Sequence, residues 1–508
     1  MSSVPSSIDS APPSGGAASP GRAGLAIDSA PPSGGAGSPG KAGLAITDAY
    51  DPERFRRDGH AVIDMLADAL ARAQARTGVV LPWHAPEAAR TEWGEAPLTA
   101  GSGELVADLA RFVERSTQLA HPQCMAHQVP PPLPGAVLAE AVAALVNNGM
   151  AVYEMGPAAV PIELAVIEFL CARLGYPAGA GGVLTSGGSL GNLTALLAMR
   201  QSHAGFDAWN QGTHGGPALS VITSNESHYS VSRAISIMGW GEAGVIAAPV
   251  DEHHRLTVHA VRAALHTARN QDRRVIGIVA AAGSTATGAF DPLNELADLC
   301  DREKLWLHVD AAHGGGVALS PTHRSKLAGI ERADSVVWDA HKLLMMPALV
   351  TAVLFKQEHH AYEAFAQHAS YLFAEARPET RWWDLGTRTL ECTKRAMAIE
   401  LWTALRVHGE EWFGEVIDRQ VALTRAFAQK ITASSDFELA QEPELNIICY
   451  RHRTADNAEL RRRVVEDGRF YIVGIKLGDV YYLRSTIMNP LIEESDFDRL
   501  LEHLRSLC

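Results

Sequence analysis

A series of short apolar runs between about residues 180 and 355 constrains the fold of this chain more than any other feature. Stretches with helical patterning separate the runs, as at 292–304 after Asp291. Apolar strands that alternate with helices are typical of a mostly parallel sheet covered by helices on both faces. We therefore predict an α/β fold whose strands contain the runs 183–184, 219–223, 275–281, 305–309, 335–338 and 349–355.

The segments before and after this region have different patterns. Asp51 can cap a helix that begins at Pro52, and apolar residues at helical spacing continue to Ala73. Near the C-terminus, 470–477 and 480–487 flank the turn Gly478-Asp479, which indicates a hairpin. The chain is therefore divided into a helical segment at 47–120, a large domain at 121–400 and a small α+β domain at 401–508.

The N-terminus contains a tandem duplication, because residues 27–45 repeat residues 8–26 with changes only at positions 37 and 41. The repeat is rich in Pro, Gly and Ser and cannot bury a core. We predict that residues 1–46 form a disordered, dispensable tail. A docking arm is the alternative.

Composition excludes several classes of function. The formal net charge of −14 argues against nucleic-acid and membrane-surface partners. The six cysteines form no Cys-x-x-Cys pair and no cluster with histidines, so neither a metal site nor a disulfide scaffold is expected. No apolar run reaches the roughly 18 to 20 residues of a membrane span, and the N-terminus lacks a signal-peptide pattern. We predict a cytoplasmic protein.

The first strand of the central region is followed by the glycine-rich sequence TSGGSLGN at 185–192 and then by a helical stretch. Glycines allow close approach of the backbone to an anion, and N–H groups at a helix start point toward it, which suggests a phosphate site. The loop contains no lysine and lacks P-loop spacing, so a nucleoside triphosphate is disfavoured. A plain turn is the alternative for the loop taken alone.

Two later strands also end in chemical groups. The run at 305–309 is followed by Asp310 and the small residues Ala311 and Ala312, where a flat ring could pack while the carboxylate holds a ring nitrogen protonated. Another run is followed by Lys342, which lies between Trp338 and the apolar stretch 343–347. Burial would favour the uncharged, nucleophilic form of such a lysine, which could then form a Schiff base.

A phosphate site, an aspartate for a ring nitrogen and a buried lysine together indicate pyridoxal 5′-phosphate. The sequences WLHVDAAHGGG and HRSKLAGIERADSVVWDAHK resemble the group II pyridoxal-phosphate amino-acid decarboxylases. The resemblance is to the glutamate and cysteine-sulfinate branch, with bacterial diaminobutyrate decarboxylases nearby, and extends from about Asp51 to the C-terminus. It implies a fold-type I enzyme, similar to aspartate aminotransferase.

The resemblance also implies roles for individual residues. Lys342 would hold the cofactor covalently, and Asp310 would pair with its ring nitrogen. His228 would stack on one ring face, which makes these three the predicted catalytic residues. The remaining cofactor-binding residues would be Gly188, Ser189 and His341 at the phosphate, Thr285 near the phenolic oxygen and Ala312 on the other ring face.

Substrate recognition would involve two further segments. Arg484 matches the arginine that holds the substrate α-carboxylate in the glutamate branch, and a bidentate guanidinium suits a carboxylate. His127 and Gln128 lie in a stretch that resembles the lining of the substrate side-chain pocket. Alternatively, Arg484 is an arginine on the surface of a strand. The identity of the substrate side chain is not determined by these residues.

The chain departs from the family at one position that affects the mechanism. In the family, a tyrosine on a mobile loop protonates the substrate carbon after carbon dioxide has left. Tyr371 precedes the corresponding loop here, and the loop itself, 374–385, contains no tyrosine. His228 or His368 is a candidate for the missing acid.

These observations predict a pyridoxal-phosphate-dependent α-decarboxylase that acts on a small polar or acidic amino acid, such as glutamate, aspartate, cysteine sulfinate or diaminobutyrate. The tyrosine-free loop supports one alternative, a decarboxylating oxidative deaminase that makes an aldehyde. A catalytically silent binding protein on the same fold is the other. The resemblance further implies a homodimer with its active sites at the interface.

Overall fold

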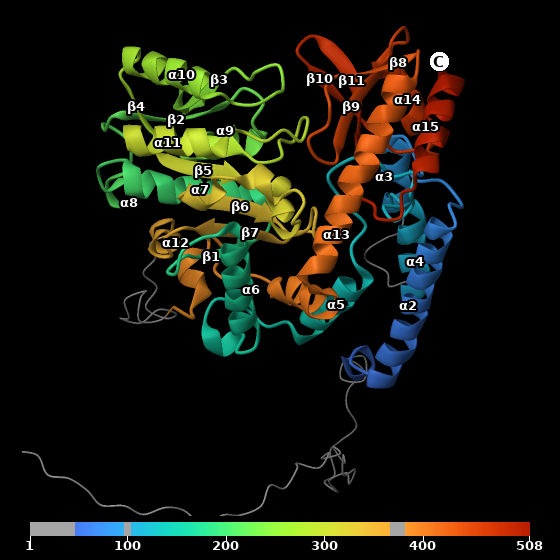
Figure 1. Cartoon of the computed structure of the whole chain (residues 1–508). Coiled ribbons are helices and arrows are strands. Elements are labelled where there is room, and N and C mark those ends of the chain that lie inside the picture. The colour runs from blue at the N-terminus through green and yellow to red at the C-terminus, as the bar shows by residue number, and fades with distance from the viewer. Residues whose placement is uncertain (1–45, 96–102, 366–381) are drawn as a thin grey trace, which may run out of the picture. The chain divides into compact units, whose positions relative to one another are not determined.

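The computed structural model of the chain describes residues 46–95, 103–365 and 382–508 (Figure 1). Ala61–Cys508 forms one compact unit, and the described residues before Ala61 belong to a second unit. Several predicted features lie outside the described residues: the repeat at 8–45, Tyr371, His368 and the loop as far as position 381.

The large sheet is built from the apolar runs of the central region. It has the strand order β1-β7-β6-β5-β4-β2-β3, in which β7 is antiparallel to both neighbours and the other pairs are parallel. The prediction of a mostly parallel sheet is confirmed. The edge strand β3 was not predicted, because it is short and only partly buried. The strands are β1 (Gly181–Thr185), β2 (Ala218–Ser224), β3 (Val245–Ala248), β4 (Arg273–Ala281), β5 (Trp306–Asp310), β6 (Ser335–Asp339) and β7 (Thr351–Phe355).

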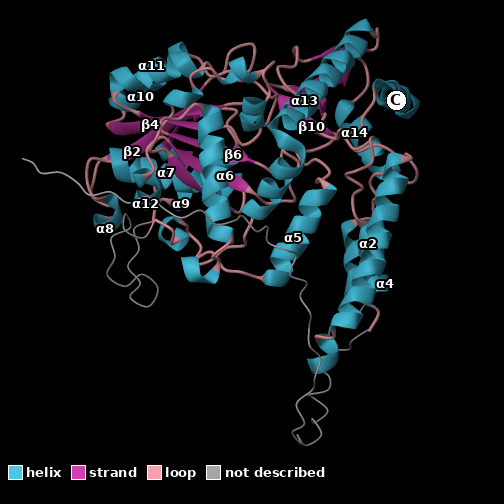
Figure 2. Ribbon diagram, turned by 60° about the horizontal axis from the view of Figure 1, so that its bottom comes forward, coloured by secondary structure: helices cyan, strands magenta, loops and turns pink. Residues whose placement is uncertain are grey.

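Helices cover both faces of this sheet (Figure 2). Neighbouring strand residues point to opposite faces, so Val183 packs in a core with residues of α7 and α9, whereas Leu184 packs with residues of α6 and α11. The helices of this region are α5 (Pro134–Val146), α6 (Ala159–Leu174), α7 (Gly188–His203), α8 (Ala208–Gln211), α9 (Tyr229–Ile237), α10 (Val258–Asn270), α11 (Leu293–Glu303) and α12 (His359–Glu363). Short 3₁₀ helices lie at Tyr153–Met155, Glu242–Gly244, Gly314–Leu319, Arg324–Leu327, Ile330–Arg332 and Leu385–Arg388.

The C-terminal region forms a second, antiparallel sheet with the order β10-β11-β9-β8. The predicted hairpin is confirmed, and Gly478 takes a φ of 59° in its turn, where glycine avoids a steric penalty. Helix α13 contacts both α5 and this sheet (Figure 1). It crosses position 400, where the sequence predicted the boundary between the large and the small domain, and Gly409 interrupts its helical geometry. The elements are β8 (Phe437–Leu439), β9 (Ile447–His452), β10 (Val473–Leu477), β11 (Val480–Thr486), α13 (Ala398–Ala433), α14 (Asn457–Asp467) and α15 (Glu494–Leu507).

The described N-terminal segment contains α2 (Pro52–Gln74), α3 (Pro86–Gly94) and α4 (Leu105–Arg115), which come before α5 in the chain. The predicted cap of α2 is confirmed, because the Asp51 carboxylate accepts hydrogen bonds from the backbone N–H groups of Glu53 and Arg54. Among the described residues, no helix is long and apolar enough to cross a membrane.

Candidate active site

A cavity of about 190 Å³ lies at the edge of the large sheet where β1, β2, β4, β5 and β6 end. Ligands of open α/β sheets bind at the carboxyl ends of the strands, and this cavity has that position. The cavity brings together eight residues that the sequence analysis singled out: Gly188, Ser189, His228, Thr285, Asp310, Ala312, His341 and Lys342.

The glycine-rich loop forms one wall. β1 ends at Thr185 and α7 begins at Gly188, and the first N–H groups of a helix have no carbonyl partner within it. A Cβ atom on Gly188 would lie 3.2 Å from both carboxylate oxygens of Asp339, so only glycine fits there without displacing that side chain. The loop therefore offers backbone donors to an anion.

Asp310 is held in one orientation at the end of β5, between Ala281 of β4 and Val337 of β6. Its Oδ1 accepts a hydrogen bond from the backbone N–H of Ala312 at 3.1 Å. Its Oδ2 accepts one from Asn192 Nδ2 at 2.9 Å. The carboxylate is thus oriented before any ligand binds.

Lys342 follows β6 and has a counter-charge that the sequence analysis did not assign. Its Nζ lies 3.1 Å from Oδ2 of the buried Asp339, and that carboxylate also accepts a hydrogen bond from Thr351 Oγ1 at 2.6 Å. His341 Nε2 lies 3.5 Å from the same Oδ2. Asp339 ends its strand as Asp310 does, so the signal that identified one carboxylate could have identified the other.

His228 is the N-cap of α9, where its Nδ1 accepts a hydrogen bond from the backbone N–H of Ser230. Burial lowers the pKa of His228, and the negative charge of Asp310 offsets only part of this effect. The imidazole is therefore neutral near pH 7, and it borders the cavity.

Several further residues line the cavity to which the sequence assigned no role, among them Asn192, Glu226 and His313. Asn192 bonds Asp310, and Glu226 Oε1 lies 2.8 Å from His254 Nδ1. His313 Nε2 lies 2.7 Å from Asn446 Oδ1, and burial lowers the pKa of His313 to about 3. These residues could have been identified from the sequence because they lie close to the predicted site residues along the chain.

The three predicted substrate residues do not line this cavity. Arg484, which is 5% exposed, donates from Nε to the carbonyl of Ala286 at 3.0 Å and from Nη2 to the carbonyl of Thr285 at 2.7 Å. His127 Nε2 lies 3.0 Å from the Tyr471 hydroxyl. Gln128 Nε2 is buried and has no partner among the described residues. The guanidinium of Arg484 therefore contacts the backbone of Thr285 in the cavity wall, whereas His127 and Gln128 are not among the residues that line the cavity.

A positive electrostatic environment surrounds the predicted substrate segment. Burial lowers the pKa of His127, and the charges of Arg484 and Arg461 lower it further. Burial also lowers the pKa of Arg484. The Nε of Arg461 is buried, and within the described ranges it has no hydrogen-bond partner.

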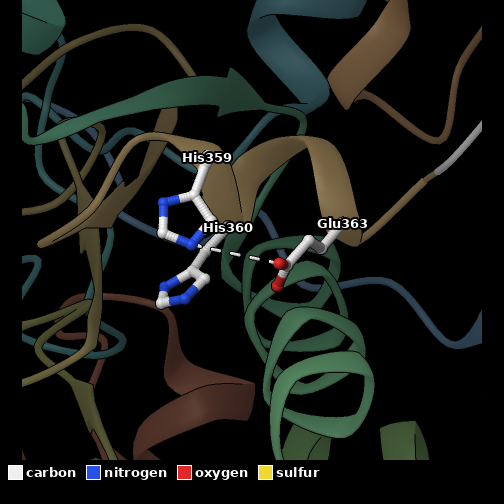
Figure 3. A group of neighbouring side chains, drawn as sticks. All are labelled: His359, His360 and Glu363. Atoms are coloured by element: carbon white, nitrogen blue, oxygen red, sulfur yellow. Dashed lines mark ion pairs between the residues drawn. The ribbon is translucent and has the colours of Figure 1, made fainter. Parts of the chain in front are cut away.

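A separate group of titratable side chains, His359, His360 and Glu363, lies on α12 (Figure 3). His359 Nε2 faces Glu363 Oε1 at 3.9 Å. The three candidate ligand atoms all lie within 4.8 Å of one another, and ligands about 2.1 Å from one tetrahedral zinc ion are about 3.4 Å apart. The 3.9 Å between His359 Nε2 and Glu363 Oε1 exceeds that value, so these two side chains would have to move closer to bind one ion.

Comparison with known proteins gives consistent results. Residues 95–453 match the pyridoxal-dependent decarboxylase conserved domain. Cysteine sulfinic acid decarboxylase of Mus musculus is 31% identical over 466 residues, which cover 87% of this chain and 93% of that protein. L-2,4-diaminobutyrate decarboxylase of Acinetobacter baumannii is 30% identical, with 77% of this chain and 80% of that protein covered.

The fold is similar as well. The crystal structure of mouse CSAD superposes with a TM-score of 0.84 and 27% identity, and the match covers 90% of this chain and 99% of that chain.

Proposed function

Because the chain belongs to the pyridoxal-dependent decarboxylase family, we propose specific roles for its cavity residues and a class of substrate for it. It is a pyridoxal-phosphate-dependent amino-acid decarboxylase, a carboxy-lyase. One observation carries the proposal. A single cavity joins the anion-binding loop, the oriented carboxylate of Asp310 and the lysine that follows β6.

The residues around the cavity fit the cofactor. The start of α7, at Gly188 and Ser189, offers donors to its phosphate, and His341 borders the same space. Lys342, which has Asp339 as its counter-charge, would supply the amine that binds the aldehyde carbon of the cofactor.

When bound, the cofactor withdraws electrons from the substrate carbon as carbon dioxide leaves. Asp310, whose carboxylate is oriented by two N–H donors, would keep the ring nitrogen protonated through its negative charge. Ala312 and His228, which both border the cavity, would contact the two faces of the ring, and Thr285 would contact its phenolic oxygen.

We propose a small polar or acidic amino acid as the substrate, with Arg484 binding its α-carboxylate and His127 and Gln128 facing its side chain. The charges of Arg484 and Arg461 near His127 support an anionic group there. The names of the relatives, which include a cysteine sulfinic acid decarboxylase, agree with this class.

We also propose that the enzyme is a cytoplasmic homodimer. Helix α5 presents an apolar face to solvent, on which Val142 is 59% and Leu145 is 69% exposed, and large exposed apolar faces mark association sites. All six cysteines lie in the described part of the chain, and none forms a disulfide, which suits a reducing compartment.

The test is turnover of the purified holoenzyme on glutamate, aspartate, cysteine sulfinate, 2,4-diaminobutyrate and aromatic amino acids, with carbon dioxide and amine measured. We expect turnover of at least one acidic substrate and its loss in the Lys342→Ala variant. Lys476→Ala, which changes an exposed lysine on β10, is the matched control. Undiminished turnover by Lys342→Ala would remove that lysine from its role, and no carbon dioxide from any substrate would refute the activity.

The tyrosine-free sequence at 374–385 favours a second product, an aldehyde made by oxidative deamination. Oxygen uptake and hydrogen peroxide in the same assay distinguish the two reactions. Amine formation without oxygen uptake excludes the aldehyde route.

A further inference from the structure

A chain of hydrogen-bonded side chains runs through the core behind the cavity and ends at His228 and Asp310. Trp306 Nε1 donates to Ser335 Oγ at 2.9 Å, and that oxygen lies 2.9 Å from His308 Nδ1. His308 Nε2 lies 2.9 Å from Asn192 Oδ1. Each of these side chains is at most 1% exposed.

This hydrogen-bond network branches at Asn192. Its Nδ2 donates to Asp310 Oδ2 at 2.9 Å and to Ser230 Oγ at 2.8 Å. Ser230 Oγ lies 2.7 Å from His228 Nδ1, so one amide group links the carboxylate at the end of β5 to the imidazole that caps α9.

The contacts at the Trp306 end are compatible with His308 Nδ1 as an acceptor. An indole N–H can only donate, so it occupies a lone pair of Ser335 Oγ, and the Ser335 hydroxyl hydrogen is free to point at His308 Nδ1. Nδ1 then accepts, and the proton of a neutral imidazole lies on Nε2. Burial lowers the pKa of His308, which keeps the ring neutral.

The Asp310 end decides between the two tautomers of His308. A carboxylate only accepts, so the atom of Asn192 that faces it is the amide nitrogen. The amide oxygen of Asn192 therefore faces His308 and needs a donor, which is His308 Nε2–H.

The same reasoning fixes the tautomer of His228. A backbone N–H can only donate, and the N–H of Ser230 points at His228 Nδ1 at 3.3 Å. The Ser230 hydroxyl accepts from Asn192 and has its hydrogen free for the same Nδ1. Nδ1 is therefore an acceptor with two donors, and the proton of neutral His228 lies on Nε2.

We propose that His308, Asn192 and Ser230 are positioning residues that hold His228 as its Nε2–H tautomer and fix the Asp310 carboxylate at the cavity wall. In this arrangement His228 offers the cavity a hydrogen-bond donor and has no free lone pair. It can bind an oxygen atom of the substrate or cofactor, but in its neutral form it neither accepts a proton there nor replaces the missing tyrosine as the acid.

The direct test is ¹⁵N NMR of the histidines in the cofactor-free full chain, with His228 and His308 assigned through His228→Gln and His308→Gln. The ¹⁵N shifts distinguish a protonated from an unprotonated ring nitrogen. We expect Nε2–H on both residues near pH 7. Nδ1–H on either residue would overturn the proposal, and this result does not depend on any activity.

A kinetic test rests on the proposed function and uses two variants of His308. Phe retains a similar ring but has no donor for Asn192, whereas Gln provides a donor and an acceptor. We expect His308→Phe to lower kcat and the affinity for pyridoxal phosphate at least tenfold with KM changed less than twofold, and His308→Gln to recover both to within threefold of wild type.

If His308 had a purely structural role, His308→Phe would lower thermal stability but would not lower kcat while leaving KM nearly unchanged. Equal losses in the Phe and Gln variants would overturn the positioning role. If no substrate is turned over at all, the proposed function fails while the tautomer result stands. Ser232→Ala, on the exposed side of α9, is the control for changes in that helix.

Discussion

At the residue scale, Arg484 has two tasks that a single substitution can separate. Its guanidinium holds the turn at Thr285 and Ala286 through two carbonyls. A planar guanidinium still has N–H groups left for a substrate carboxylate, whereas a lysine has one ammonium and cannot reproduce the fork.

We expect Arg484→Lys to raise KM at least tenfold, which corresponds to about 1.4 kcal/mol of binding, and to lower Tm by several degrees because the carbonyls lose a donor. Steady-state kinetics and a thermal melt measure the two effects. Arg462→Lys, on the exposed face of α14, is the control. A normal KM would show that Arg484 does not bind substrate.

Glu400 is a buried carboxyl whose charge has little compensation. It is 3% exposed, and its Oε2 has no partner among the described residues. Burial raises the pKa of Glu400 to about 8, the charge of Glu140 adds to this, and Arg395 offsets part of it.

The folded-state pKa of this carboxyl therefore exceeds its unfolded value of about 4.3, so the folded state binds the extra proton between these pH values. Stability falls as pH rises through that window. Because glutamine stays neutral, we expect Glu400→Gln to be more stable than wild type at pH 8, with the difference vanishing near pH 4. Thermal melts across this range measure it, and a pH-independent difference would contradict the argument.

The sequence allowed us to predict those cavity residues that lie at the end of a strand. Lys342 and Asp310 each follow an apolar run, and parallel strands end at one edge. The bond between Asn192 and Asp310 was not predictable, because these residues are 118 positions apart and meet only through the order of the strands.

At the element scale, a buried ion pair joins α6 to the end of β1. Lys394 Nζ contacts Glu163 and donates to the carbonyl of Leu184 at 2.6 Å. Glu163 accepts from the backbone N–H of Leu184 at 3.0 Å. The pair thus secures the strand that leads into the glycine-rich loop.

We expect Lys394→Met to destabilise the fold by about 3–5 kcal/mol, because Glu163 would remain as a buried charge without its partner. The double variant with Glu163→Leu should recover most of this loss, although Leu184 N–H then lacks an acceptor at a cost of about 1–3 kcal/mol. Urea unfolding measures both. A decrease in the free energy of unfolding of less than about 1 kcal/mol in the single variant would mean that the pair contributes little to stability.

The elements that sequence reasoning found share strong local signals. The hairpin of β10 and β11 has a turn sequence, and α2 has a cap. The edge strand β3 has neither a turn signal nor full burial, and β8 has only three residues, so local patterning did not reveal them.

At the scale of the whole molecule, helix α5 presents an uncovered apolar face in the described part of the chain. Leu138 is 53% exposed, and Val142 and Leu145 are more exposed still. Association that removes such apolar surface from water is favourable.

We expect the double variant Val142→Glu and Leu145→Glu to be monomeric at micromolar concentration and to lose most activity, because charges would be buried at the proposed interface. Light scattering with assay of the same sample measures this. Lys476→Glu is the control for added negative charge. A wild-type monomer, or an unaltered dimer in the double variant, would contradict the proposed assembly.

The antiparallel placement of β7 has a consequence for how the chain folds. Its pairing with β6 makes the segment from Ala340 to Val350 a local connection, whereas every parallel neighbour requires a crossover. Closing a short loop costs less chain entropy than bringing distant segments together. The anchor at Lys342, with Asp339 and Thr351 beside it, therefore belongs to a region of low contact order, which can form early and on which the rest of the cavity then assembles.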